Sequence, residues 1–120
     1  MISIVDDDEC ARKATAGLIR SLGYPLVTHE SAEDFLGSDH VNNTSCLITD
    51  VHMPGLSGVE LYERLRVDGF AAPTIFVTGQ PDEATRTRVL AAGAIAFLSK
   101  PFGKQALLDC LQAASAHHRV

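Results

Sequence analysis

Polar residues follow four short apolar runs of the sequence, and their side chains have complementary chemistry. Asp6-Asp7-Asp8 follows the first run, Asp50 follows another, and Thr78 and Lys100 follow the last two. Carboxylates that are brought together repel one another, and in a partly dry cleft they stay ionised only if a cation neutralises them. Mg²⁺ is such a cation, because it binds oxygen ligands and keeps waters and an open coordination position. These residue types therefore predict an acidic cation site.

Three of these residues also suit phosphoryl chemistry. A carboxylate can act as a nucleophile and form an acyl phosphate, and Asp50 is the best candidate because it stands alone after a strand that is expected to be central. Lys100 could neutralise an incoming phosphoryl oxygen, and the Thr78 hydroxyl could hydrogen-bond to another. Taken alone, three aspartates after a strand commonly form a solvated turn, and Asp8 is expected to cap the next helix.

These residues can meet only if the apolar runs belong to one sheet. Residues 2–5, 46–49, 74–77 and 95–98 are short apolar runs typical of buried strands, and residues 26–29 form a weaker fifth run. The carboxyl ends of parallel strands meet at one edge of a sheet, which is where ligands bind in doubly wound folds. We therefore expect the polar residues to converge at that edge.

Segments with helical spacing separate the runs. Apolar residues up to Leu22 fit one face of a helix that ends at Gly23, and Ser31 and Ser57 each begin a capping-box pattern. Asp82 is expected to cap a fourth helix, and residues 103–116 form a fifth. Five alternations of strand and helix predict an α/β fold with a doubly wound five-stranded parallel sheet. Residues 1–120 are expected to form one domain, with a surface loop at 38–44.

The composition excludes several classes of protein. Hydrophobic residues make up 46 % of the 120 residues, charged residues make up 21 %, and no apolar run is long enough to span a membrane. We therefore expect a cytoplasmic protein. The formal net charge of −5 disfavours direct binding of nucleic acid. The spacing of the cysteines, Cys10, Cys46 and Cys110, indicates no metal site. The spacing of four histidines indicates none either, and these are expected at the surface: His29, His40, His117 and His118.

Over essentially its whole length the chain resembles the receiver domains of two-component response regulators, which are CheY-like. The matching segments are residues 2–9 (ISIVDDDE), 47–58 (LITDVHMPGLSG), 76–79 (FVTG) and 97–102 (FLSKPF). The Asp-x-x-Met-Pro-x-x-x-Gly portion is the most specific of them. The resemblance implies the flavodoxin-like (βα)5 receiver fold and phosphorylation of Asp50 by a sensor histidine kinase.

The resemblance also implies a role for each residue around Asp50. Asp6 and Asp7 would be the acid pair for Mg²⁺ or Mn²⁺, with Asp7 a direct ligand, and Asp50 and the backbone carbonyl of His52 would complete the protein ligands. Thr78 and Lys100 would contact the phosphoryl group. Lys100-Pro101 would be a cis peptide bond, which proline makes accessible and which would aim the lysine inward.

The response to phosphorylation can be assigned to further positions in the same way. Thr78 and Phe97 match the switch pair of the family, in which the aromatic ring turns inward as the hydroxyl moves toward the phosphoryl group. The face made by the fourth helix, the fifth strand and the fifth helix would change with them. An ordinary core phenylalanine is the other interpretation of Phe97. His52 and Gln80 border the path of the attacking water, and either they tune dephosphorylation or they are solvated loop residues.

What the phosphorylated domain controls is implied only by its resemblance to one group of receiver domains. The segments look most similar to those of FixJ-type transcription regulators, which carry a helix-turn-helix DNA-binding domain after the receiver. In that case these 120 residues would be an N-terminal half, and phosphorylation would promote a homodimer through the fourth-helix to fifth-helix face. A stand-alone receiver that acts on a protein partner is the alternative. In either case the domain is expected to be a switch and not an enzyme, except toward its own phosphorylation and dephosphorylation.

Two other functions share part of this chemistry. A phosphohydrolase of the haloacid dehalogenase type also uses an aspartate nucleophile, but it would need a second aspartate where this chain has His52, and it would need room for a cap domain. A pseudo-receiver that only binds a partner would be marked by loss of the acceptor, the lysine or the acid pair. None of these is lost in this sequence.

Overall fold

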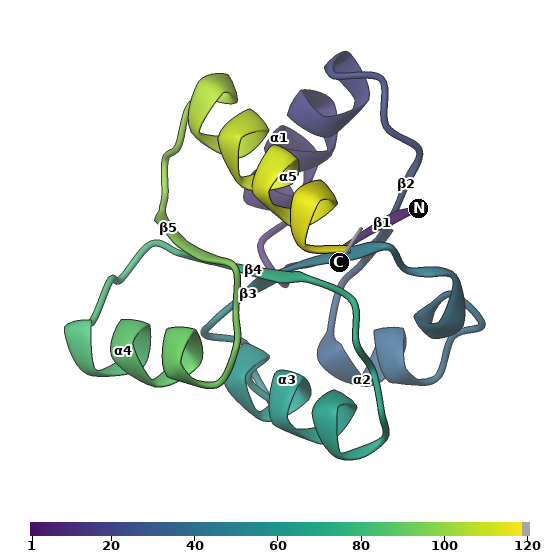
Figure 1. The fold of residues 1–120 in the computed structure, drawn as a ribbon, viewed down its shortest axis with the longest axis vertical. Helices are drawn as coiled ribbons and strands as arrows, with labels where there is room; N and C mark the ends of the chain where they lie inside the picture. The colour runs from purple at the N-terminus through teal and green to yellow at the C-terminus, as the bar shows by residue number, and fades with distance from the viewer. Residues whose placement is uncertain (119–120) are drawn as a thin grey trace.

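The computed structural model describes residues 1–118, in which five strands alternate with five α-helices (Figure 1). None of the described helices is both long and apolar enough to cross a membrane. In chain order the elements are β1 Ile2–Val5, α1 Glu9–Ser21, β2 Leu26–His29, α2 Ala32–Leu36, the 3₁₀ helix η1 Val41–Asn43, β3 Cys46–Asp50, α3 Gly58–Val67, β4 Thr74–Thr78, α4 Glu83–Ala91, β5 Ala96–Ser99 and α5 Lys104–His118.

The strands form one parallel sheet in the order β2-β1-β3-β4-β5, which confirms the predicted doubly wound fold. β1 and β2 have the predicted limits, and β3 and β4 begin as predicted but end one residue later, at Asp50 and Thr78. β5 begins and ends one residue later than predicted. Because β1 connects to β2 on one side and lies beside β3 on the other, the strand order reverses between β1 and β3. A ligand site is expected at the carboxyl ends of these two strands.

Helices cover both faces of the sheet, with α1 and α5 on one face and α2, α3 and α4 on the other (Figure 1). On the first face Ile4 packs with Ile19 and Leu107 in one apolar cluster. On the second face Val5 packs with Phe35, and both are completely buried. Alternate side chains of β1 therefore enter different cores, which explains why its sequence is continuously apolar.

Two of the predicted helix ends have the expected caps, and a third has only part of the predicted cap. Ser57 and Glu60 form a reciprocal capping box at the start of α3, and Gly23 follows α1 with a positive φ of 89°. The prediction for Ser31 was half wrong. Its hydroxyl accepts a hydrogen bond from the Asp34 N–H, but the Asp34 carboxylate contacts His29 and does not return to the Ser31 backbone.

The histidines also depart from one expectation. His29 is only 5 % exposed, so its predicted place at the surface was wrong. His29 is the last residue of β2, and its ring contacts Phe35 of α2 and His40 in the segment after α2. His40 is half-buried in the predicted loop, which contains η1, and the side chains of His117 and His118 lie outside the described part of the structure.

Candidate functional site

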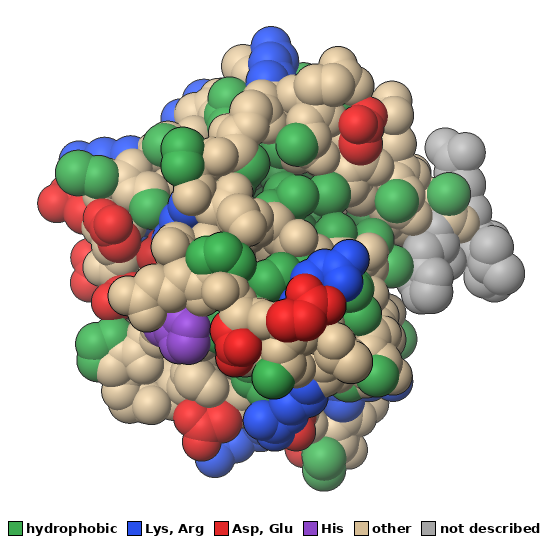
Figure 2. Space-filling view, turned by 90° about the vertical axis from the view of Figure 1, so that its left-hand side faces the viewer, with side chains coloured by type: hydrophobic (Ala, Val, Ile, Leu, Met, Phe, Trp, Pro, Cys, Tyr) green, Lys and Arg blue, Asp and Glu red, His purple; other side chains and the backbone are tan. Residues whose placement is uncertain are grey.

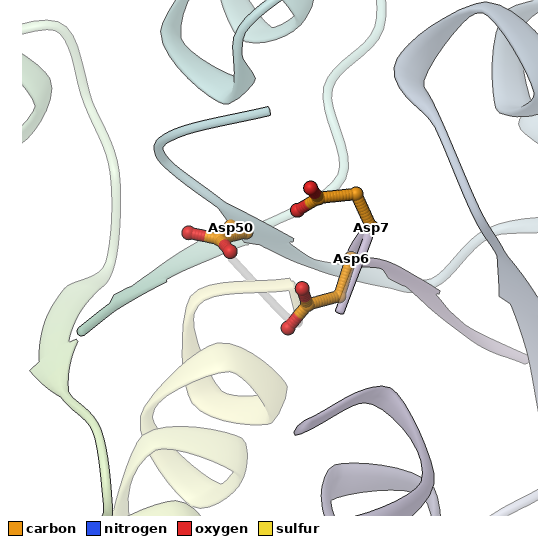
Figure 3. A group of neighbouring side chains, drawn as sticks. All are labelled: Asp6, Asp7 and Asp50. Carbon is orange, nitrogen blue, oxygen red and sulfur yellow. The ribbon is translucent and has the colours of Figure 1, made fainter. Parts of the chain in front are cut away.

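Three carboxylates converge where the strand order reverses. Asp6 follows β1 directly, Asp7 is next in the chain, and Asp50 is the last residue of the adjacent strand β3. Each offers an oxygen that lies within 4.8 Å of the others, and Figure 3 shows the side chains gathered beyond the strand ends. Asp6 is 1 % exposed and Asp50 is 7 % exposed, whereas Asp7 is open to solvent. The predicted acidic cluster is therefore present, with two of its members in the protein interior.

Lys100 lies between two of these carboxylates. Its Nζ donates hydrogen bonds to Asp6 Oδ2 at 2.8 Å and to Asp50 Oδ2 at 3.0 Å. Lys100 follows β5 and stands 94 residues from Asp6 in the chain. The Lys100–Pro101 peptide bond is cis. The chain thus brings the candidate acceptor, one acid of the pair and the lysine into direct contact.

Burial and neighbouring charge shift the pKa of both partners at the centre of the site. Burial raises the pKa of Asp50, and repulsion by Asp6 raises it further, although the hydrogen bond from Lys100 lowers it. Burial lowers the pKa of Lys100, but its hydrogen bonds to Asp6 and Asp50 outweigh this effect and leave the pKa raised. With all three carboxylates ionised, one ammonium leaves two negative charges. The arrangement therefore has the charge and the oxygen ligands that suit a divalent cation.

The backbone of Asp50 is held closely by the following loop and helix. The His52 N–H donates to Asp50 Oδ1 at 3.2 Å, and the Gly58 N–H donates to the carbonyl of Val51 at 2.9 Å. A Cβ at Gly58 would lie only 1.9 Å from the carbonyl oxygen of Asp50. The first residue of α3 must therefore be glycine for the helix to approach the acceptor this closely.

The other predicted residues lie around this centre. Thr78 ends β4 and is buried, and its hydroxyl accepts a hydrogen bond from the Gln80 N–H at 3.0 Å; no bond joins it to Asp50 in the described residues. The side chains of His52 and Gln80 are exposed. Phe97 is half-buried on β5 and lines a hollow of about 270 Å³ beside α4.

Two contacts near the site were not predicted. The guanidinium of Arg12 in α1 is 11 % exposed and donates to the backbone carbonyl of Asp6 at 2.9 Å. The carboxylate of Glu33 in α2 accepts a hydrogen bond from the Leu56 N–H at 3.0 Å, so α2 holds the loop after the acceptor. A charged residue on the helix after a strand is too common a pattern to indicate either contact.

An apolar hollow opens beside the carboxylates. Figure 2 shows the face formed by the carboxyl ends of the strands, where apolar side chains line a depression in the upper half. The hollow has a volume of about 350 Å³ and lies between α1 and the segment after β5, with Leu18 and Phe102 among its lining residues. Lys100 forms part of its wall, so the hollow adjoins the site.

A doubly wound parallel sheet with acids after β1, an aspartate at the end of β3 and a lysine after β5 defines a receiver domain. The chain belongs to the response regulator receiver domain family, because the family model of that description matches residues 2–112. Domains of this family are signalling switches of two-component systems. They bind Mg²⁺ at an acidic pocket, and sensor histidine kinases phosphorylate them.

Curated relatives and solved structures agree with this assignment. Nodulation protein W of Bradyrhizobium diazoefficiens is 40 % identical over 119 residues, which are 99 % of this chain and 52 % of the relative. The transcriptional regulatory protein FixJ of Rhizobium meliloti is 35 % identical over 97 % of this chain and 57 % of its own length. The chain thus spans about half the length of these relatives. The crystal structure of FixJ-N superposes with a TM-score of 0.86 at 35 % identity, covering 97 % of this chain and 93 % of that chain.

Proposed function

We propose that residues 1–120 form one phosphorylation switch, in which Asp50 accepts a phosphoryl group from a sensor histidine kinase in the presence of Mg²⁺. The convergence of Asp50, Asp6 and Lys100 is the observation that carries this proposal. A nucleophilic carboxylate, a cation site and a positive charge for the phosphoryl oxygens are the parts that phosphoryl transfer requires. The apolar hollow beside Lys100 offers the kinase a surface next to the acceptor.

The carboxylates of Asp6, Asp7 and Asp50 would hold the metal, together with the backbone carbonyl of His52. The fit rests on hard oxygen donors and on two uncompensated negative charges, and Mn²⁺ has the same ligand preference. When bound, the metal offsets the negative charge that collects on the phosphoryl oxygens. Asp7 is the exposed member and is therefore the ligand that solvent and metal reach first.

In the transfer step a carboxylate oxygen of Asp50 bonds to phosphorus while the bond from phosphorus to the histidine nitrogen of the kinase breaks. The nitrogen keeps the electron pair of that bond and takes up a proton from solvent. Lys100 exchanges its hydrogen bond to Asp50 Oδ2 for one to a phosphoryl oxygen, and Asp6 keeps the ammonium in place. The ammonium of Lys100, which bridges two carboxylates before transfer, then bridges Asp6 and the phosphoryl group.

The response would begin at Thr78. Its hydroxyl bonds to the Gln80 N–H before phosphorylation and would turn to the phosphoryl group afterwards. Phe97 lies on the neighbouring strand, paired with Phe76 of β4, and would fill the space that Thr78 leaves. The α4–β5–α5 face changes in consequence. The exposed side chains of His52 and Gln80 border the acceptor and would set how long the acyl phosphate survives attack by water.

The output proposed for this switch is transcription regulation in the cytoplasm. The support is that relatives such as FixJ and TdiR are named transcriptional regulatory proteins and are about twice as long as this chain. A DNA-binding domain in the same protein would read the altered face, and phosphorylation would favour a homodimer through it. A stand-alone receiver acting on a protein partner is the second candidate for the output.

Mass spectrometry tests the acceptor directly. The chain is incubated with acetyl phosphate and Mg²⁺, and we expect a gain of one phosphoryl group that does not form when EDTA is present from the start or in the variant Asp50→Asn. The exposed loop residue Asp39, changed to Asn, is the matched control and should still be phosphorylated. A gain that persists in Asp50→Asn would contradict the assignment of the acceptor. No gain with any small donor or kinase would favour a module that only binds.

Two further measurements test the response. Light scattering of the phosphorylated chain should show a dimer, and an unchanged monomer counts against dimerisation through the α4–β5–α5 face. Replacing both His52 and Gln80 by alanine should change the lifetime of the acyl phosphate, and an unaltered lifetime would remove both residues from that role.

A further inference from the structure

The side chain of Arg12 in α1 is mostly buried beside the segment that carries the acid pair. It is 11 % exposed, and its Nη1 donates a hydrogen bond to the backbone carbonyl of Asp6 at 2.9 Å. The carboxylate of Glu30 lies 3.7 Å from its other terminal nitrogen, and the Glu30 side chain is 82 % exposed, so water screens this ion pair. The close partner of Arg12 is therefore the backbone of one of the three acids.

A guanidinium at this place does not help a cation site through its charge. Burying a charged group costs free energy unless the group is paired. A positive charge beside the segment that carries two of the carboxylates also repels a divalent cation. If Arg12 serves the site, it therefore does so through the geometry of the backbone that it holds.

The bond from Arg12 fixes the peptide unit between the two acids of the pair. The carbonyl oxygen of Asp6 lies in one rigid plane with the nitrogen and Cα of Asp7. On the other side of its Cα, the Asp6 N–H donates to the carbonyl of His29 in β2 at 3.1 Å. The following peptide is also held, because the Asp8 N–H donates to Asp6 Oδ1 at 3.0 Å. Asp7 thus lies between two peptide units whose orientations are set by hydrogen bonds.

The backbone matters most for Asp7, which is the exposed member of the cluster. A side chain that is open to solvent has little packing to hold it, so its place depends on its backbone. Figure 3 shows Asp7 beside Asp6 at the end of β1. Rotation of the Asp6–Asp7 peptide would displace Asp7 from the arrangement in which oxygens of the three acids lie within 4.8 Å of one another.

We propose that Arg12 is a positioning residue of the metal site, which holds the Asp6–Asp7 peptide so that Asp7 is placed as a ligand. This inference rests on the proposed function, because it takes the three carboxylates as the Mg²⁺ site. Arg12 acts through the backbone of Asp6 and contacts neither the metal nor the phosphoryl group. The helix α1, which carries none of the proposed ligands, thereby shapes the site.

Titration of the full chain with Mn²⁺, followed by the electron paramagnetic resonance signal of the free ion, measures the affinity of the site. We expect one equivalent to bind to the parent chain and Arg12→Met to lower the affinity by about tenfold or more, as is typical for residues that orient metal ligands. Lys13→Met is the matched control, because it removes the same charge from the next position of α1, where Lys13 is 73 % exposed. This control should bind Mn²⁺ at least as tightly as the parent.

The sign of the change separates the two effects of Arg12. An influence through charge alone would make Arg12→Met bind Mn²⁺ more tightly, because a repelling charge is removed. An affinity of Arg12→Met that equals or exceeds that of the parent overturns the inference and leaves the proposed function standing. Absence of Mn²⁺ binding by the parent chain overturns both.

A merely structural role predicts a different pattern in the phosphorylation assay. The Mg²⁺ concentration for half-maximal phosphorylation by acetyl phosphate should rise in Arg12→Met by the same factor by which the metal affinity falls. Arg12→Lys keeps a charged donor of nearly the same reach and should recover part of the affinity. A lower rate with an unchanged Mg²⁺ requirement would show that Arg12 only stabilises the fold.

A measurement on the unaltered chain keeps the test valid if Arg12→Met fails to fold. In ¹⁵N spectra of the guanidinium groups, Arg12 should give separate Nη signals with EDTA and with Mg²⁺, because its bond to Asp6 hinders rotation of the group. A single averaged Nη signal in either condition contradicts the bond, and with it the inference.

Discussion

Replacing Lys100 by methionine tests how the site is held together in the absence of metal. The ammonium lies 2.8 Å from Asp6 Oδ2 and 3.0 Å from Asp50 Oδ2, and the side chains of these two acids are 2 % and 9 % exposed. Methionine keeps most of the length of lysine without its charge. The change therefore leaves two buried carboxylates beside each other with no cation between them.

The expected loss follows from this burial. Removing one partner of a buried ion pair typically costs about 3–5 kcal/mol of the free energy of unfolding, because the remaining charge stays buried. The Lys100 side chain is 18 % exposed, so water screens part of the effect, and we expect a value near the lower limit. Small domains are stable by about 5–15 kcal/mol, so the variant should fold with a much lower urea midpoint.

The pH dependence has a definite sign. Burial already raises the pKa of Asp50, and loss of the hydrogen bond from Lys100 removes an influence that lowers it. A carboxyl group whose pKa is raised by folding stabilises the fold below its unfolded pKa and loses that stabilisation as the pH rises through the folded pKa. The deficit of Lys100→Met should therefore be largest at neutral pH and shrink as the pH falls toward the ordinary range of carboxyl groups.

Urea unfolding at neutral and at mildly acidic pH, with EDTA, measures the deficit. Lys13→Met is the matched control, because Lys13 is 73 % exposed and pairs with Glu9 on the surface of α1, where water and salt screen the pair and its loss should change stability little. Mg²⁺ should restore part of the stability of Lys100→Met. Equal losses in the two variants, or a loss in Lys100→Met that is independent of pH, would refute the reasoning.

Three other changes have expected outcomes. Gly58→Ala should destabilise the domain by about 2 kcal/mol or more in urea unfolding, because its Cβ would lie 1.9 Å from the Asp50 carbonyl oxygen; wild-type stability would show that α3 can move away. Ser57→Ala should lose about 1 kcal/mol with the capping box, and an unchanged urea midpoint would contradict this. Asp50→Asn should raise the melting temperature at neutral pH without metal, since folding raises the pKa of this acid, and the gain should vanish on acidification.

The strands could be predicted because the sheet is covered on both faces. Apolar residues of β1, β3 and β4 are buried without interruption, so their runs stand out in the sequence. β2 and β5 lie at the edges and most of their residues are only partly buried or exposed, so these two runs give a weaker signal than those of the central strands. The convergence of Asp6, Asp50 and Lys100 followed from the same rule, since parallel strands end at one edge.

Contacts that depend on tertiary packing could not be predicted in this way. The closeness of Gly58 to the Asp50 backbone depends on how α3 packs, and many helices begin with a glycine that makes no such contact. The burial of His29 depends on α2 and the following segment covering an edge strand. In both cases the contacting residue belongs to a different element of the fold, so the periodicity of the residue's own element carries no information about the contact.

The separation of 94 positions between Asp6 and Lys100 has a consequence for synthesis of the chain. β1 leaves the ribosome early, whereas Lys100 follows the last strand of the sheet, and long-range pairings of this kind form late in folding. A nascent chain that has not yet released β5 has the aspartates but not the ammonium that joins two of them. The contact between Lys100 and the two buried carboxylates can thus form only after β5 and Lys100 have left the ribosome.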